Sequence, residues 1–140
     1  MDTKRIVEGL IRKYGTNDPF IIADNLGIII LHRNLRNTLG FFSHYKRFRF
    51  IHLNNNVPEK LQTFVCAHEL GHAIQHPRVN TPFLKTYTLY STSRIEREAN
   101  TFAVELLLPD SLLADYQGCS IYNIAKSVGI PEKLVDYKLS

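Results

Sequence analysis

The stretch "VCAHELGHAIQH", residues 65–76, places three histidines and a glutamate in a segment that otherwise has the apolar pattern of a buried helix. It follows "NNNVPEKLQTF", in which Asn56 or a neighbouring residue can cap a helix and Pro58 suits the first turn. Pro77 ends the pattern. The sequence therefore predicts one long helix from about residue 56 to His76, and the spacing of its polar side chains indicates their purpose.

His68 and His72 lie four residues apart, so on a helix they project from the same face, one turn apart. Both imidazoles can then reach one metal ion, and Glu69 lies beside them, rotated by about 100°. A carboxylate at that place can take a proton from metal-bound water, whose pKa zinc lowers toward about 7. The alternative is a chance pair of buried histidines with a surface glutamate, which the HExxH spacing makes the less favoured interpretation.

His76 continues the same helix face but lies too far along it to bind the same ion. Eight residues at about 1.5 Å each separate its Cα from that of His68 by about 12 Å. We expect His76 to be a histidine at the end of the helix, a residue that contacts a ligand histidine, or a pocket residue.

A catalytic zinc site takes three protein ligands, and "SRIEREANTFAVELLLP", residues 93–109, offers the third. On a helix, Glu96 lies roughly 60° from the centre of the apolar face, Glu98 roughly 100°, and Glu105 farther still. A charge as close to the core as Glu96 is costly unless a cation relieves it. The phase therefore predicts Glu96, rather than Glu98, as the third ligand.

Two other interpretations of this helix remain open. Ser93 and Glu96 also have the S-x-x-E spacing of a capping box, in which Glu96 would bond the backbone at the helix start. Asn100 follows Glu96 by one turn and is predicted to hydrogen-bond a ligand histidine, with ordinary solvation on the helix surface as the alternative.

The rest of the chain is typical of one α+β domain covering residues 1–140. Its 140 residues are 44% hydrophobic and 21% charged, as in an ordinary globular domain. We expect a small three-stranded sheet packed on the helical core, and a C-terminal helical pair. The predicted elements are helices at 3–14 and 18–27, strands at 28–31 and in a 40–53 hairpin that turns near 46–47, a helix from about 93 to 108, and a helix-turn-helix-like element at 119–140.

Composition also limits compartment and partners. Cys66 and Cys119 lack CxxC spacing and are expected to be reduced. No apolar run is long enough to span a membrane, and the N-terminus has no signal-peptide pattern. We therefore expect a cytoplasmic protein. A net charge of +4 permits contact with nucleic acid without requiring it.

Two segments have some features of nucleic-acid surfaces, and neither is favoured as one. "HYKRFRF", residues 44–50, mixes basic and aromatic residues, but a half-exposed hairpin explains it better. The last helix carries Glu132 and Asp136, which suits packing or partner docking better than a phosphate backbone.

"HELGHAIQH" followed by "EREANTFAVELLLP" resembles the ImmA/IrrE family of zinc metallopeptidases. The resemblance implies a gluzincin-like HExxH site with one Zn²⁺ per chain, held by His68, His72 and Glu96. It further implies Glu69 as the catalytic base and Asn100 in the place where thermolysin-like enzymes have an orienting side chain. Family members from mobile elements act as anti-repressors that cut a helix-turn-helix repressor, so the resemblance implies such a protein as the substrate.

The sequence thus predicts a zinc endopeptidase, with parts of the site left open. Tyr87, Tyr90 and His44 are candidates for stabilising the oxyanion or contacting substrate, although such residues more often serve packing. A substrate segment could add as a strand to the edge of the 40–53 hairpin. The alternative function is a non-proteolytic regulatory module, DNA-associated or of the toxin-antitoxin type, with a structural metal; histidine and carboxylate ligands also suit manganese, iron or cobalt.

Overall fold

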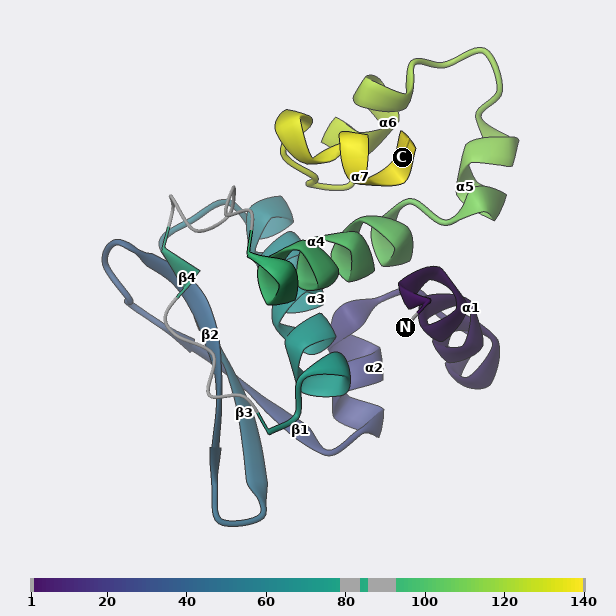
Figure 1. Ribbon diagram of the computed structural model, residues 1–140. Coiled ribbons are helices and arrows are strands. Elements are labelled where there is room, and N and C mark those ends of the chain that lie inside the picture. The colour runs from purple at the N-terminus through teal and green to yellow at the C-terminus, as the bar shows by residue number, and fades with distance from the viewer. Residues whose placement is uncertain (1, 79–83, 86–92, 140) are drawn as a thin grey trace.

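The computed structural model describes residues 2–78, 84–85 and 93–139. It has the predicted α+β arrangement: a sheet lies along one side and the helices lie on the other (Figure 1). Among the described residues, no helix combines the length and the apolar character needed to cross a membrane.

The first two helices begin and end at residues that the sequence marks. Helix α1 spans Thr3–Tyr14; the Asp2 side chain accepts a hydrogen bond from a backbone N–H of its first turn, and Gly15 ends it with a φ of 67°. Helix α2 spans Pro19–Asn25 and is capped in the same way by Asp18. Such caps are expected at helix ends, because they satisfy backbone groups that lack a partner within the helix.

The sheet contains the three predicted strands and one short addition. Its order is β1-β3-β2-β4, with β1 parallel to β3 and β2 antiparallel to both β3 and β4. The strands are β1 (Ile28–Arg33), β2 (Thr38–Tyr45), β3 (Phe48–Asn54) and β4 (Leu84–Lys85). The two-residue β4 was not predicted, because so short a strand has no periodicity to detect; it pairs with β2 only at Thr38 and Gly40.

Alternation along the strands directs one face of the sheet toward the helices. Phe42, Ile51 and Leu53 share that face and are at most 3% exposed. The predicted turn of the β2–β3 hairpin is present at Lys46 and Arg47, with Lys46 in the left-handed region at a φ of 55°.

Helix α3, Glu59–Gln75, is the centre of the fold because it lies between the sheet and helix α4, Arg94–Leu107 (Figure 1). Every residue from Phe64 to Ala73 is buried. The two helices cross very closely at Gly71, where an added Cβ would lie 2.9 Å from the Cβ of Phe102. Glycine at this position therefore sets the separation of the two helices.

The C-terminal part, after α4, consists of short helical segments. These are α5 (Asp110–Asp115), α6 (Ile121–Ser127), the 3₁₀ helix η2 (Glu132–Leu134) and α7 (Asp136–Leu139). Two helical segments thus flank Gly129, and the second is divided into η2 and α7.

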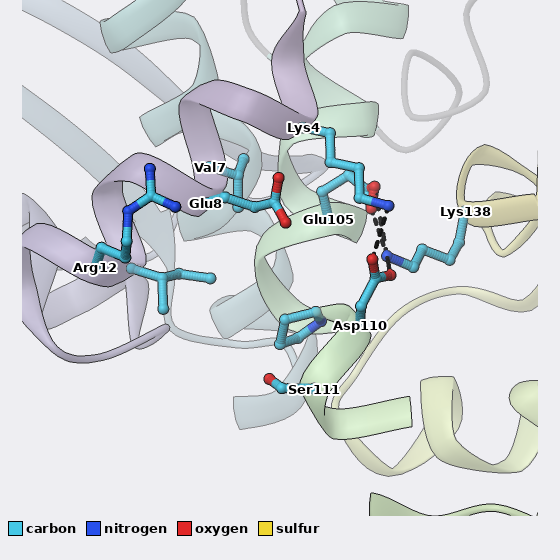
Figure 2. A pocket seen from close by; sticks show the side chains of 10 residues that line it. Lys4, Val7, Glu8, Arg12, Glu105, Asp110, Ser111 and Lys138 are labelled. Carbon is cyan, nitrogen blue, oxygen red and sulfur yellow. Dashed lines mark hydrogen bonds and ion pairs between the residues drawn. The ribbon is translucent and has the colours of Figure 1, made fainter. Parts of the chain in front are cut away.

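Ion pairs fasten this C-terminal part to α1 and α4. Lys138 of α7 lies 2.5 Å from Glu105 of α4 and 2.7 Å from Asp110, which also pairs with Lys4 of α1 at 2.8 Å (Figure 2). The side chains of Lys138 and Glu105 are only 5% and 8% exposed. Glu105, which the helical phase placed outside the apolar face, is therefore buried because α7 supplies its partner.

The closeness of the two helices at Gly71 gives a stability prediction. Gly71→Ala should lower the free energy of unfolding by about 1–3 kcal/mol, because the new methyl group collides with the Phe102 side chain in a packed core. Gly9→Ala is the matched control: it lies inside α1 with no atom within 4 Å of an added Cβ, so it should be neutral or stabilising by up to about 1 kcal/mol. Denaturant unfolding measures both, and equal effects of the two substitutions would contradict the proposed crossing.

Candidate metal centre

Helices α3 and α4 bring together the three residues that the sequence predicted as ligands. His68, His72 and Glu96 each offer one donor atom, and these atoms lie within 4.8 Å of one another. The Nε2 atom of His72 is 2.5 Å from Glu96 Oε1, and that of His68 is 3.4 Å from Oε2. Ser93 is the N-cap residue of α4, and its side chain makes no capping hydrogen bond.

The cluster is almost sealed from solvent, and the charges within it shift one another's pKa values. Both histidines are at most 1% exposed, and the Glu96 side chain is 13% exposed. Burial raises the pKa of Glu96, but its close contacts with the two imidazoles prevail and hold that pKa at about 2. Burial lowers the pKa of both imidazoles; for His68 the nearby carboxylates outweigh it and raise the pKa, whereas for His72 burial prevails.

Asn100 holds the ring of His68 from the side away from Glu96. It is fully buried, and its Oδ1 lies 2.7 Å from His68 Nδ1. Because a carbonyl oxygen only accepts, Nδ1 of His68 carries the hydrogen and Nε2 presents a lone pair toward Glu96. The contact predicted for Asn100 is therefore present, and its alternative, solvation on the helix surface, is absent.

A second chain of hydrogen bonds does the same for His72 and includes a residue that the sequence analysis missed. His72 Nδ1 lies 3.1 Å from His76 Nδ1, and His76 Nε2 lies 3.0 Å from Glu98 Oε1. Since the Glu98 carboxylate accepts, His76 donates from Nε2 and accepts at Nδ1, which makes His72 donate from its own Nδ1. His76 thus lies outside the donor cluster, as its distance along the helix predicted, and contacts a candidate ligand instead.

Glu98 is not one of the clustered donor residues, which agrees with its helical phase, but its contact with His76 was not predicted. Helical phase measured the angle of Glu98 from the apolar face of α4 alone, and it could not register the end of α3 packed against that side. The spacing of His72 and His76 was the available signal, because a histidine one turn beyond another contacts it on the same face.

These hydrogen bonds make a cation at the cluster a good fit. With both Nδ1 atoms protonated, the Nε2 lone pairs face the Glu96 carboxylate, and such acceptors repel one another unless a cation lies between them. Within the described part of the chain, His68 Nε2 is a buried atom with no hydrogen-bond partner. Two imidazole nitrogens and one carboxylate oxygen are a donor set that zinc accepts.

Glu69 lies next to this cluster but does not join it. It is 1% exposed, the backbone amide of Phe42 in β2 hydrogen-bonds its carboxylate, and its Oε1 has no partner among the described residues. Burial, aided by the charge of Glu96 and opposed by His68 and by Phe42, raises its pKa to about 7. A carboxyl group with that pKa can both take up and release a proton near neutral pH.

The other predicted residues are not part of the cluster. Tyr87 and Tyr90 lie outside the described residues. His44 is exposed on β2, with its ring 5.9 Å from that of Phe42. Cys66 is buried, Cys119 is exposed, and both are free thiols.

A pocket between α1, α5 and α7 is also separate from the candidate metal centre. Its lining includes Lys4, Glu105 and Lys138, and none of the cluster residues (Figure 2).

Comparison with known proteins identifies the family of the chain. The family model described as the IrrE N-terminal-like domain, a peptidase family, matches residues 23–140. The chain is 44% identical over 138 residues to a protein of Bacillus phage phi105 named "Uncharacterized immunity region protein 2", covering 96% of this chain and 87% of that protein. It is 36% identical over 143 residues to the metallopeptidase ImmA of Bacillus subtilis strain 168, covering 98% of this chain and 83% of that one. The chain therefore belongs to the ImmA/IrrE family of metallopeptidases.

Proposed function

We propose that this protein is a zinc-dependent endopeptidase that cuts a helix-turn-helix transcriptional repressor of a phage or mobile element in the cytoplasm, where such a repressor acts. The observation that carries the proposal is the buried Glu69 carboxylate beside three converging donor atoms. The names of the two relatives, one an immunity region protein and the other a metallopeptidase, support a protein substrate from a phage immunity system.

In this proposal His68, His72 and Glu96 hold one Zn²⁺ per chain. When bound there, zinc supplies Lewis acidity, which activates water and polarises a peptide carbonyl. Asn100 and His76 keep the two imidazole rings in the orientation and tautomer that this requires, and Glu98 in turn holds His76.

Glu69 is the proposed general base and acid. It takes a proton from the attacking water as the water oxygen bonds the carbonyl carbon, and it then gives that proton to the leaving amine nitrogen as the C–N bond breaks. Burial raises the pKa of Glu69 above that of an exposed glutamate, which favours both transfers near neutral pH.

The position of β2 supports the proposed route for the substrate. The Phe42 amide bonds Glu69, so the backbone of β2 passes directly beside the candidate base. A substrate segment that adds to this edge as a strand would lie across the cluster. His44, two residues further along β2, remains a candidate for contacting the substrate or the oxyanion.

The alternative, a regulatory binding module with a structural metal, is less well supported. Structural zinc sites are usually closed by four protein ligands, whereas three donor groups converge here among the described residues. A structural site also has no need of a buried carboxylate next to its ligands.

Cleavage of a repressor tests the function. The protein should be co-expressed with the helix-turn-helix repressor encoded nearest to its gene, in the wild type and as Glu69→Gln. This variant keeps the size of the side chain and one acceptor oxygen but cannot act as a base. We expect a defined cut by the wild type and a loss of rate by at least about 100-fold in the variant. An intact repressor in both cases, or an equal cut in both, would show that the proposed protease mechanism is wrong.

Zinc affinity tests the assignment of the ligands and of the residues that hold them. Glu96→Ala should lose zinc almost completely, while His76→Phe and Glu98→Leu should weaken binding by about 10- to 100-fold because the His72 ring loses its partner chain. Glu59→Gln, an exposed carboxylate at the start of α3, is the control and should bind like the wild type. Competition with a chromophoric chelator measures all four, and wild-type affinity in Glu96→Ala would rule out the ligand set.

A further inference from the structure

The charges of the sheet are unusually one-sided. Between Asp24 and Glu59 the chain holds five of its 17 lysines and arginines and none of its 13 acidic residues. All of β1, β2 and β3 lie within this interval. The sheet is therefore a positively charged part of a molecule whose remaining charges nearly balance.

The five cations of this interval do not all serve the same purpose. Arg49 is partly buried and donates a hydrogen bond to the carbonyl of Leu26, so it stabilises the packing of the sheet on α2. Arg33 and Arg36 lie at the end of the strands opposite the hairpin turn. Lys46 and Arg47 form the turn itself, are exposed, and pair with no carboxylate among the described residues.

The two residues that flank the turn are aromatic and exposed. Tyr45 and Phe48 face one another across the hairpin, at 66% and 49% exposure. The Lys46 ammonium lies 5.5 Å from the Tyr45 ring centre and the Arg47 guanidinium 5.8 Å from that of Phe48. We call residues 45–48 the hairpin tip. Exposed aromatic rings with cations beside them are typical of surfaces that bind another molecule.

The hairpin tip is continuous with the edge that leads to the candidate active site. It projects beyond the helices at the lower end of the sheet (Figure 1). Lys46 follows Phe42, whose backbone contacts Glu69, by four residues, a distance of about 13 Å along a strand. A polypeptide lying along β2 would therefore bring side chains about four residues from its scissile bond to the hairpin tip.

We propose that the hairpin tip binds an acidic segment of the protein substrate, about four residues away from the bond that is cut. This inference rests on the proposed endopeptidase function and adds a recognition site to it. Carboxylates complement Lys46 and Arg47, and the rings of Tyr45 and Phe48 offer apolar contact to the chain between them. Nucleic acid is the less suitable partner, because two unpaired cations at the tip are far fewer than the roughly six to ten phosphate contacts of a typical nucleic-acid binder.

Binding is best measured in the zinc-loaded Glu69→Gln protein, so that no cleavage interferes. The probes are a fluorescein-labelled peptide of alternating glutamate and serine, the same peptide with glutamine in place of glutamate, and a labelled oligothymidylate. The test variant is Lys46→Asn with Arg47→Gln, since asparagine tolerates the left-handed backbone at position 46. Arg5→Gln with Lys126→Gln removes the same charge from exposed positions on α1 and α6 and is the matched control.

The proposal predicts that the glutamate peptide binds more tightly than the glutamine peptide, and that the tip variant weakens this binding by about three- to tenfold while the control does not. Raising the salt from about 0.05 M to about 0.5 M should remove most of the difference, because the charges are exposed. A tip variant with Lys46→Arg and Arg47→Lys should bind like the parent.

Three results would overturn the proposal: equal binding of the two peptides, an equal loss in the control variant, or tight binding of oligothymidylate alone. These failures differ from a failure of the proposed function. Tip binding is measured without cleavage, so it can hold in a protein that proves not to be a protease; a protease whose peptide binding ignores the tip would refute this inference alone.

Discussion

The close crossing of α3 and α4 is the constraint on which the site depends. At Gly71 the two helices approach so closely that a methyl group has no room beside Phe102. Glu96, Glu98 and Asn100 lie on the same helix as Phe102. Of these, Glu98 contacts His76 and Asn100 contacts His68. One packing contact therefore sets the distance from His68 and His72 to the third donor, from His68 to Asn100, and from His76 to Glu98. A change in core volume at this crossing would be felt as a change in metal binding.

Burial of polar groups in α3 makes sense only as part of a connected network. An imidazole or a carboxylate that is buried without a partner lowers the stability of the fold. In the low dielectric of the interior, both this penalty and the energy gained by a hydrogen bond are larger. Here the chains from His68 to Asn100 and from His72 through His76 to Glu98 satisfy the outer nitrogens, and the inner ones converge on Glu96. The Nε2 atoms of both histidines are therefore free to bind a cation together with Glu96. The Phe42 amide bonds the Glu69 carboxylate, whose Oε1 has no hydrogen-bond partner among the described residues.

The positions of many residues of the site and of the helix ends could be predicted from the geometry of a single helix. The spacing of His68 and His72, the phase of Glu96 and the distance of His76 each follow from the pitch of one helix, and the structure places all of these residues accordingly. The caps at Asp2 and Asp18 are equally local. Contacts between elements could not be predicted in this way. Glu98 meets His76 across the helix interface, Glu105 is buried because α7 brings Lys138 to it, and Phe42 reaches Glu69 from the sheet. Such contacts depend on how the helices and strands pack, which no single pattern records.

The central claim is that two histidines of α3 and one glutamate of α4 bind the metal while His76 supports them from outside. X-ray absorption spectroscopy of the zinc-loaded protein tests it most directly, because the spectrum distinguishes imidazole, oxygen and sulfur neighbours of the ion. The account predicts two imidazole ligands with the remaining positions occupied by oxygen, at about 2.0–2.2 Å. A third imidazole, a sulfur ligand at about 2.3 Å, or a protein that binds no zinc would contradict it.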